Sequence, residues 1–569
     1  MRTAREMGLQ TVAVYSEIDR DAMHVRLADE AYLLGPASPS QSYLNADRIL
    51  EIAGRSDVRY VHPGYGFLAE NAAFARAVSE AGLTWVGPHP DAIDAMGDKM
   101  HARQAMIAAG VPVVPGGTEE ISDVEAAKAA AKKYGLPLAL KASGGGGGKG
   151  LKVAYSADEL GAALSTAKRE AEAYFKNGAI YAERYLENPK HIELQILADK
   201  HGTVLHVGER DCSLQRRHQK LWEETPPSVS SRVREGIREA GIRAAKAIGY
   251  DSAGTIEWLV TGEEFFFLEM NTRIQVEHTV TEMVSGLDLV REQIRSASGE
   301  RIGYDQDAIA FRGHSIEGRI NAEDPANDFR PAPGTVSTYR EPGGLGVRID
   351  SAAFPGFTIG SEYDSMIAKL VVWAPDRTQA LARFRRALDE YLIEGVPTTL
   401  HLLRRLCDHP PVMDATYTTS TLETFAASDA AVLPAVRVSL SNHAEQRAVI
   451  SPVEGTSSQQ IPVEVNGKLY HVRVFDRPSK DAARKPRRAA RNDRAAAASG
   501  NDVVSPMHGA VVEMPVSEGT AVSEGQIVAV VEAMKMMNEI RAHKAGTVSK
   551  VHAKSGDTVE SNSALVTID

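Results

Sequence analysis

Short apolar segments alternate with longer amphipathic ones through residues 1–95. The segments at 11–15, 59–62 and 83–87 are rich in valine, threonine and aromatic residues, which favours β-strands. Enough chain separates them for intervening helices, so the pattern predicts β-α-β units and a parallel, doubly wound sheet. Residues 1–8 are typical of the end of a helix closed by glycine. A doubly wound unit normally has a strand before such a helix, so we expect a truncated domain whose first strand is missing.

Residues 96–305 and 306–425 combine helical and strand patterns and predict two further units of mixed structure. Within the first of them, residues 124–134 have the composition and spacing of a helix. Within the second, residues 377–391 are amphipathic with a helical period.

Two segments after residue 425 differ from the rest of the chain. Residues 461–475 alternate in polarity around an Asn-Gly pair, which predicts a β-hairpin with a type I′ turn. We expect the small β-containing region 426–478 to dock a partner. Residues 479–501 are basic and alanine-rich without interleaved aromatic residues, which favours a flexible linker over a nucleic-acid site. Such a coil would reach about 25 Å.

Residues 502–569 contain an internal repeat with a constant offset of 37 positions. The paired positions are Gly509 and Gly546, Gly519 and Gly556, Val522 and Val559, and residues 528–531 and 565–568. Neither half alone could bury its apolar face, so the repeat predicts a small all-β sandwich of two related halves. The halves join at residues 532–536, which places Lys535 in a turn at one tip of the domain.

The composition narrows the function classes. The 569 residues are 43% apolar and 24% charged, which is ordinary for a soluble globular protein, and the length fits roughly three to five domains. The net charge of −11 argues against a nucleic-acid or anionic-membrane partner. Cys212 and Cys407 cannot build a disulfide framework, and the sequence shows no signal core or spanning apolar run, so we expect a cytoplasmic protein.

Lys535 is a candidate for covalent modification. An exposed lysine is usually a solvated charge, but this one lies at the symmetry point of a duplicated domain that follows a linker. Such a position suits an amine that carries a long prosthetic group between sites, because tethering raises the local concentration at each site. The tetrapeptide 533–536, Ala-Met-Lys-Met, resembles the biotinyl domain of biotin-dependent carboxylases, although Met537 replaces the glutamate that the family commonly has there. The resemblance implies biotin on Lys535, attached by a biotin protein ligase.

Five consecutive glycines, Gly144–Gly148, follow Lys141 closely. Glycine lets backbone N–H groups approach a phosphate, and lysines at both ends of the run supply positive charge. Ser143 and Gly150 do not fit the Walker pattern, and residues 151–155 are strand-like where a Rossmann site needs a helix. A disordered linker is the alternative. Strand patterns on both sides of the run favour a glycine-rich flap over ATP.

Polar and apolar residues alternate from Leu268 to His278. If this segment is one strand, a single face carries Glu269, Asn271, Arg273, Gln275 and Glu277. Glu257, on the preceding strand of a predicted hairpin, can point to the same end. Two carboxylates and an amide oxygen are ligands that Mg²⁺ prefers, and Mg²⁺ bridges the phosphates of ATP. A solvated strand is the alternative.

Residues 1–425 resemble biotin carboxylase, an ATP-grasp enzyme. The resembling motifs are, in order, 62–71 (HPGYGFLAEN), 96–99 (MGDK), the glycine run, 183–190 (ERYLENPK), 209–220 (ERDCSLQRRHQK), 269–278 (EMNTRIQVEH) and 318–324 (GRINAED). The implied fold class is multidomain α/β and α+β. Its implied parts are a biotin carboxylase N-terminal domain (1–95), an ATP-grasp domain (96–305), a biotin carboxylase C-terminal domain (306–425), the docking region (426–478), the linker (479–501) and an all-β biotinyl domain with a flattened sandwich (502–569).

The resemblance also implies roles for individual residues. The implied ligands of Mg²⁺ or Mn²⁺ are Glu257, Glu269 and Asn271. The implied bicarbonate site comprises Lys220, Arg273 and the backbone at Val276. Glu277 would be the base that deprotonates bicarbonate, and Arg319 would stabilise negative charge on the biotin ring. The implied nucleotide site comprises Lys99, Lys141, Gly147, Gly148, Glu183, Arg184, Tyr185, Leu186, His191, Gln215 and His218, with Glu257 and Glu269.

The combination of both parts is similar to the alpha subunits of acetyl-CoA and propionyl-CoA carboxylases. It implies ATP- and bicarbonate-dependent carboxylation of biotin on Lys535, with transfer to an acyl-CoA by a separate carboxyltransferase beta subunit in a hetero-oligomer. Two alternatives stay open. One is a non-catalytic biotin carrier and scaffold subunit, suggested by the missing first strand. The other is a different ATP-grasp ligase, against which the carrier domain argues.

Overall fold

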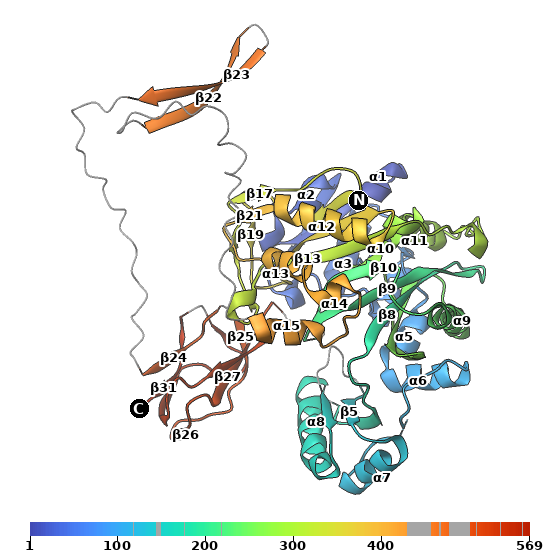
Figure 1. Ribbon diagram of the computed structural model, residues 1–569, viewed down its shortest axis with the longest axis vertical. Coiled ribbons are helices and arrows are strands. Elements are labelled where there is room, and N and C mark those ends of the chain that lie inside the picture. The colour runs from blue at the N-terminus through green and yellow to red at the C-terminus, as the bar shows by residue number, and fades with distance from the viewer. Residues whose placement is uncertain are drawn as a thin grey trace, which may run out of the picture.

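The computed structural model describes the chain apart from residues 118, 144–149, 176, 218, 430–456, 466–467, 477–500, 508, 535 and 560–561. Figure 1 shows a large body formed by the first three quarters of the chain and a smaller β-domain beside it near the C-terminus. Within the described ranges, no helix is both long and apolar enough to cross a membrane.

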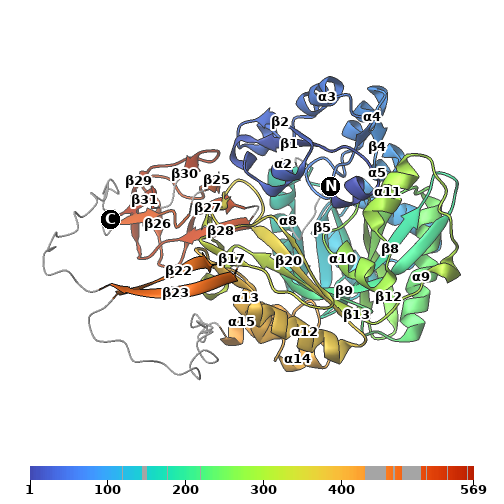
Figure 2. The same cartoon turned by 90° about the horizontal axis from the view of Figure 1, so that it is seen from above.

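The N-terminal unit contains two pairs of parallel strands with helices around them (Figure 2). The pairs are β1 (Val12–Ser16) with β2 (Glu30–Gly35), and β3 (Tyr60–Val61) with β4 (Thr84–Trp85). The helices are α1 (Arg2–Glu6), α2 (Met23–Leu27), α3 (Ala46–Arg55), α4 (Ala72–Glu80) and α5 (Pro90–Gly97). Asn45 and Asn71 accept backbone N–H bonds at the starts of α3 and α4, where helices lack internal partners. The three strands predicted here are confirmed, and β2 is an additional one.

A small lobe follows and carries the glycine-rich segment. Its antiparallel sheet has the order β6 (Leu151–Ala154), β5 (Leu138–Ala142) and β7 (Ile180–Arg184). The helices of the lobe are α7 (Val124–Tyr134) and α8 (Leu160–Phe175), and α6 (Lys99–Ala108) precedes it. α7 has the predicted bounds, and its alanines pack with those of α8 against the sheet. Strands β5 and β6 lie on either side of the glycine run, as predicted.

One antiparallel sheet of eight strands extends across residues 190–374. Its order is β12 (Glu264–Asn271), β11 (Ala253–Thr261), β8 (Lys190–Ala198), β9 (Val204–Arg216), β10 (Gln219–Thr225), β13 (His314–Asn321), β20 (Met366–Ala374) and β18 (Val347–Ser351). The sheet therefore crosses the predicted boundary at residue 305, and the two units on either side of that boundary share it.

The two faces of this sheet have different chemistry. In β8, Ile192, Leu194 and Ile196 pack toward α9 (Ser231–Ala247). The cross-strand pairs of β9, β10 and β13 place Trp222 and Ile316 on the same face of the sheet as these residues. Trp222 and Ile316 belong to a second apolar cluster, which also contains residues of α12 (Arg377–Glu390). The other face is polar although it is buried, and α10 (His278–Ser285) lies over it.

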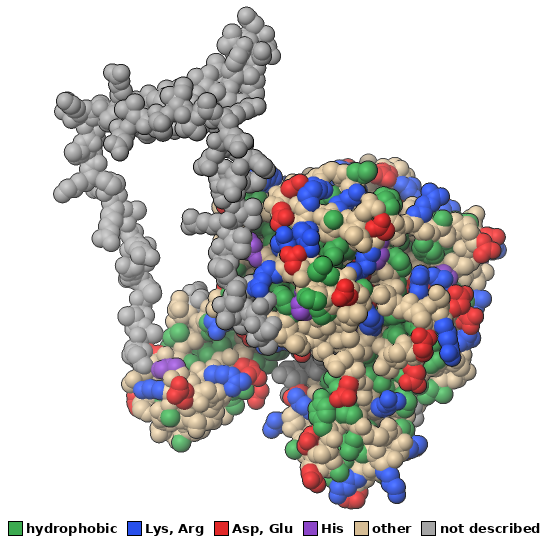
Figure 3. Space-filling view, viewed as in Figure 1, with side chains coloured by type: hydrophobic (Ala, Val, Ile, Leu, Met, Phe, Trp, Pro, Cys, Tyr) green, Lys and Arg blue, Asp and Glu red, His purple; other side chains and the backbone are tan. Residues whose placement is uncertain are grey.

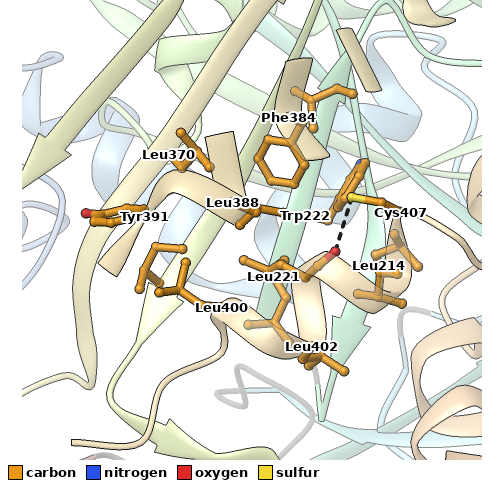
Figure 4. Close-up of a cluster of buried hydrophobic side chains, with 14 of the residues drawn as sticks. Leu214, Leu221, Trp222, Leu370, Phe384, Leu388, Tyr391, Leu400, Leu402 and Cys407 are labelled. Atoms are coloured by element: carbon orange, nitrogen blue, oxygen red, sulfur yellow. Dashed lines mark hydrogen bonds between the residues drawn. The ribbon is translucent and has the colours of Figure 1, made fainter. Parts of the chain in front are cut away.

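The largest apolar cluster lies between α12 and the sheet (Figure 4). The Trp222 and Phe384 rings meet edge to face with centroids 4.8 Å apart. Cys407 is buried in the same cluster, and its thiol donates to the Leu403 carbonyl at 3.3 Å. Cys212 is buried as well, and both cysteines are free.

The remaining elements of the large body are short. The helices are α11 (Leu289–Ala297), α13 (Leu400–Leu406), α14 (Pro410–Met413) and α15 (Thr421–Asp429). The strands are β14 (Glu323–Asp324), β15 (Arg330–Pro331), β16 (Gly334–Thr335), β17 (Thr338–Arg340), β19 (Thr358–Ile359) and β21 (Leu392–Glu394). The hairpin predicted after residue 425 is confirmed as β22 (Ser457–Val465) paired with β23 (Lys468–Asp476), and its two turn residues lie outside the described residues.

The C-terminal domain is the predicted sandwich of two four-stranded sheets. One sheet contains β24 (Asp502–Val504), β31 (Ala564–Ile568), β29 (Gly546–Val551) and β26 (Ala521–Val522). The other contains β28 (Met536–Arg541), β27 (Ile527–Ala533), β25 (Gly509–Glu513) and β30 (Thr558–Val559). Corresponding strands of the sequence repeat lie in opposite sheets, and their valines and leucines form one core. We call residues 502–569 the carrier domain.

Candidate active site

Lys220 lies at the centre of the polar face of the large sheet. Its Nζ donates to Glu277 Oε1 at 2.7 Å and to Glu257 Oε1 at 2.9 Å, and it also contacts Glu193. Burial alone would lower the pKa of Lys220, but these three carboxylates raise it well above its usual value. The amine is therefore a permanent cation that draws three acids together.

Glu277 lies between two cations. Its other oxygen, Oε2, accepts from the Arg319 guanidinium at 2.9 Å, and its side chain is 2% exposed. Burial would raise the pKa of Glu277, but Lys220 and Arg319 lower it well below the ordinary range. Arg319 also donates to Glu223 at 2.6 Å, and burial raises the pKa of that second carboxyl to about 8.

The predicted metal ligands come together on the hairpin of β11 and β12. Glu257 and Glu269 are cross-strand partners, and the Asn271 amide donates to Glu257 at 2.9 Å. Burial and the charge of Glu257 raise the pKa of Glu269, whose nearest cation is Lys99 at 3.8 Å. Two mutually repelling carboxylates next to an amide oxygen fit a divalent cation, which would remove that repulsion. Ligand atoms of His191, Glu193 and Glu257 also lie within 4.8 Å of one another. Two of these residues, Glu193 and Glu257, already accept hydrogen bonds from Lys220.

The prediction of one strand from Leu268 to His278 is wrong. β12 ends at Asn271, residues 272–277 form an irregular turn, and α10 begins at His278. The turn folds back over the polar face, so the Gln275 amide reaches Glu257 at 2.8 Å. The five polar side chains of the segment still gather, but two come from the strand and three from the turn. Polar alternation alone does not distinguish these two backbones.

Arg273 connects this turn to the N-terminal unit. Its guanidinium donates to Asn271 Oδ1 at 2.9 Å and lies 3.0 Å from Glu70. Glu70 belongs to the motif 62–71 that supported the resemblance. The Val276 carbonyl, another predicted member of the site, accepts from Lys369 Nζ at 2.6 Å.

The predicted nucleotide residues fall into two groups. In the small lobe, Lys141 contacts Glu183, which lies 3.5 Å from Arg103. Burial, with the charges of Lys99 and Arg103, lowers the pKa of Lys141 to about 7. At the end of β7, the Arg184 backbone N–H donates to the Pro115 carbonyl, and the Tyr185 N–H donates to the Pro137 carbonyl just before β5. Leu186 is buried. These residues connect the lobe to the large sheet.

The second group of predicted nucleotide residues lies on β8 and β9 of the large sheet. The Gln215 amide is 2.9 Å from His191 Nδ1, and His191 Nε2 is 3.0 Å from Glu257. Burial opposes protonation of His191, but the charge of Glu257 raises its pKa above the ordinary value. The predicted residues Gly147, Gly148, His218 and Lys535 lie outside the described residues.

Two buried residues of the site were not predicted. Arg210 is 0% exposed, and each of its three nitrogens donates to the polar face. Its acceptors are Glu193, Gln195, Thr281, Thr255 and Gln275, at 2.7 to 3.0 Å. Glu193 connects Arg210 to Lys220. The alternation of polar and apolar residues at 190–197 was the available signal for Glu193.

We expect Arg210→Met to destabilise the protein by about 3–5 kcal/mol, the usual cost of removing one partner of a buried ion pair. The substitution removes all these donors and leaves Glu193 facing Lys220 alone. Urea unfolding measures the loss. Arg234→Met is a matched control, because Arg234 is partly exposed and Arg238 also binds its partner Glu209; it should cost about 1 kcal/mol or less. Equal stability losses in the two variants would contradict a central role for Arg210.

Comparisons with protein families cover most of the chain. Residues 1–93 match the biotin carboxylase N-terminal domain, and residues 317–424 match the biotin carboxylase C-terminal domain. Residues 98–304 match the family described as carbamoyl-phosphate synthase L chain, ATP binding domain. Residues 501–568 match the family described as biotin-requiring enzyme.

Individual proteins give the same result. The chain is 42% identical, over 100% of its length and 96% of the relative's, to the biotin-dependent acyl-coenzyme A carboxylase alpha3 subunit of Mycobacterium leprae. It is 49% identical to biotin carboxylase 1 of Bacillus subtilis, over 75% of this chain and 95% of that one.

Two solved structures are also similar. Campylobacter jejuni biotin carboxylase has a TM-score of 0.72 at 44% identity, covering 74% of this chain and 95% of the other. The biotin carboxylase domain of Hydrogenobacter thermophilus 2-oxoglutarate carboxylase has a TM-score of 0.72 at 48% identity, covering 76% and 95%. That structure is described as a complex with MgADP, ADP and bicarbonate. The predicted fold class is thereby confirmed, and so are the predicted ATP-binding and biotin-requiring domains. The predicted magnesium and bicarbonate correspond to ligands of that similar structure.

Proposed function

The chain belongs to the biotin-dependent carboxylases, which are ATP-dependent ligases, and from that premise we propose that it is the alpha subunit of an acyl-CoA carboxylase. It combines a biotin carboxylase with a biotin carrier. The observation that carries the proposal is the identity over the whole chain to a relative named as an acyl-CoA carboxylase alpha subunit. In this proposal, a separate beta subunit transfers the carboxyl group to acetyl-CoA or propionyl-CoA within a cytoplasmic hetero-oligomer, and a biotin protein ligase modifies Lys535.

Bicarbonate binding is assigned to Lys220 and Arg273. Lys220 is a cation that donates to Glu277, and Arg273 is a cation in the turn of residues 272–277. A planar guanidinium suits a planar oxyanion. Without the anion, Lys220 is bonded to Glu277 and keeps that carboxylate weakly basic. An anion that engages Lys220 draws this cation away, which raises the basicity of Glu277 at the moment it takes the bicarbonate proton onto its carboxylate oxygen. The deprotonated oxygen then attacks the γ-phosphate of ATP, the bond from the γ-phosphorus to the bridging oxygen breaks, and ADP leaves with carboxyphosphate as the product.

Arg319 is assigned to the second half of the reaction. Carboxyphosphate would break down to CO₂ and phosphate. Biotin, bound through Lys535, would supply a ring nitrogen that gives its proton to the phosphate and forms a bond to CO₂. The Arg319 guanidinium, held by Glu277 and Glu223, presents a fixed positive charge where the ring becomes negative. The magnesium that accompanies ATP would be held by Glu257, Glu269 and Asn271, where it would neutralise phosphate charge.

ATP affinity should decrease with rising pH through Lys141. With a pKa of about 7, this amine is an ammonium at pH 6 and mostly neutral at pH 8. Phosphate prefers the ammonium form, so ATP binding is strongest below pH 7 and weakens above it. We expect the KM for ATP to rise by about tenfold between pH 6 and pH 8.

Lys141→Arg provides the control, because a guanidinium stays charged over this range. Its KM for ATP should change little with pH between the same limits. A wild-type KM that stays constant from pH 6 to pH 8 would show that Lys141 is not in contact with the phosphates or does not titrate there.

The acyl-CoA assignment is tested by purifying the chain together with its beta subunit. The assembled complex is assayed for ATP-dependent carboxylation of acetyl-CoA, propionyl-CoA, pyruvate and 2-oxoglutarate. We expect turnover with an acyl-CoA alone. Turnover with pyruvate or 2-oxoglutarate would overturn this assignment. These two substrates are included because one similar protein is named as a pyruvate carboxylase subunit and another as a 2-oxoglutarate carboxylase subunit. The alternative of a non-catalytic scaffold is not favoured by the similarity to carboxylases.

A further inference from the structure

The carrier domain makes a specific contact with the carboxylase of its own chain through Met534. This side chain is 3% exposed. It packs in the apolar cluster of the large body, whereas its neighbour Ala533 packs in the core of the carrier domain. Its backbone N–H also donates to the Ser361 carbonyl at 3.3 Å. Met534 is therefore held by the carboxylase rather than by the domain to which it belongs.

The backbone at Met534 suits such a contact. Its φ of +49° lies in the left-handed region that a non-glycine residue seldom adopts. This conformation sits in the tight turn between β27 and β28. The turn projects the methionine away from the carrier domain, and its unbranched thioether side chain can adapt to the surface it meets.

A second contact also joins the carrier domain to the carboxylase. A shallow pocket between the two domains is lined on the carboxylase side by Asp324, Asn327, Arg330 and Pro397, and on the carrier side by Pro506 and Met507. The carrier thus rests on two patches, and the turn bearing the modified lysine belongs to one of them.

The contact lies near the end of β13, the strand that carries Arg319. Ser361 precedes β20, and the Ala322 N–H donates to the Ser365 carbonyl at 2.8 Å, which joins the start of β20 to the end of β13. Arg319 lies in β13, three residues before Ala322, or about 10 Å along an extended chain. The carrier turn therefore meets the strand ends nearest to the guanidinium that is assigned to biotin.

We infer that the carrier is charged in cis, by docking Met534 and the 506–507 segment on the rim of its own carboxylase around Ser361 and residues 324–332. This inference rests on the proposed function and adds the docking surface and the choice of chain. Between Asp429 and Asp502 lie 72 residues, so chain length does not prevent the approach. Tethering makes the encounter intramolecular, and its rate is independent of protein concentration.

A mixing experiment tests which chain is charged. One variant, Lys535→Ala, keeps its carboxylase but cannot carry biotin, and the other, Glu277→Gln, carries biotin but lacks the base. The two are mixed with ATP and labelled bicarbonate, and protein-bound label is counted. Charging in cis predicts less than a tenth of the wild-type label at any mixing ratio. Label near half the wild-type level in a one-to-one mixture would establish charging between chains and overturn the inference.

A second variant tests the contact itself. Met534→Ala should lower the rate of labelling of tethered biotin by about tenfold or more, the factor expected for losing one buried methionine side chain. Biotin content is matched by intact mass, and Met537→Ala is the control, since Met537 is only partly buried and lies in β28. ATP cleavage stimulated by free biotin should stay unchanged in both. If Met534→Ala retains this ATP cleavage and labels its tethered biotin at the wild-type rate, the docking contact is wrong while the carboxylase function stands. If the wild-type protein itself shows no ATP cleavage stimulated by free biotin, the proposed function fails.

Discussion

Glu277→Gln is expected to lower bicarbonate-dependent ATP cleavage by roughly 10²- to 10⁴-fold, the usual contribution of general acid–base catalysis. The substitution keeps the shape of the side chain and removes its charge. It therefore removes the group assigned to take the bicarbonate proton. It also leaves Lys220 with one fewer carboxylate and Arg319 with Glu223 alone. The steady-state rate of phosphate release, with and without bicarbonate, measures the loss.

Glu282→Gln is the matched control for this variant. Glu282 lies on α10, close to Glu277 in the chain, is largely buried, and pairs with Arg348 at 2.7 Å. It is not in contact with Lys220 or Arg319 in the described structure. The control variant should keep most of its ATP cleavage. Comparable losses in both variants would mean that ATP cleavage depends on any buried carboxylate at or near α10, and that Glu277 has no special role.

Lys535→Arg is expected to abolish acyl-CoA carboxylation by the complex with the beta subunit. Arginine keeps the positive charge and the length of the side chain, but its guanidinium does not form the amide that attaches biotin. Carboxylation should fall to the background of a reaction from which the biotin-bearing chain is omitted. ATP cleavage stimulated by free biotin should persist, because the residues assigned to it lie in the large body.

Intact mass supplies the control for this experiment. The wild-type chain should carry one biotin adduct and the variant none. An adduct on the variant would place the biotin elsewhere, and full carboxylation without an adduct would contradict a role for tethered biotin.

Acidic and basic side chains share the surface of the large body. In Figure 3, acidic and basic side chains are interspersed over the face shown. The described face therefore offers no extended basic surface of the kind that nucleic acids require.

Features with a local cause could be predicted from the sequence. The repeat in the carrier domain follows from valines and glycines at equal spacing, and each copy forms the same strands. The helix Val124–Tyr134 follows from its alanines, its Asp123 cap and the glycine after it. These elements depend on neighbours within a few residues, so their pattern was sufficient.

Features that depend on contacts between distant segments could not be predicted in this way. β2 is amphipathic only weakly and is defined by its pairing with β1. The strand end at Asn271 depends on the return of residues 272–277 toward Glu257 and Lys220. Arg210 looks like one more charged residue in the sequence, and only the fold gives its guanidinium five buried acceptors. The role of Met534 depends on a domain that begins far from it in the chain.

The most direct measurement is a single turnover with labelled bicarbonate. Biotinylated protein is mixed with ATP, magnesium and the label, without beta subunit or acyl-CoA, and protein-bound label is counted after rapid gel filtration. The account predicts label that requires ATP, approaches one per biotin and is absent from both Lys535→Arg and Glu277→Gln. ATP cleavage without protein-bound label, or label that remains in Lys535→Arg, would contradict it.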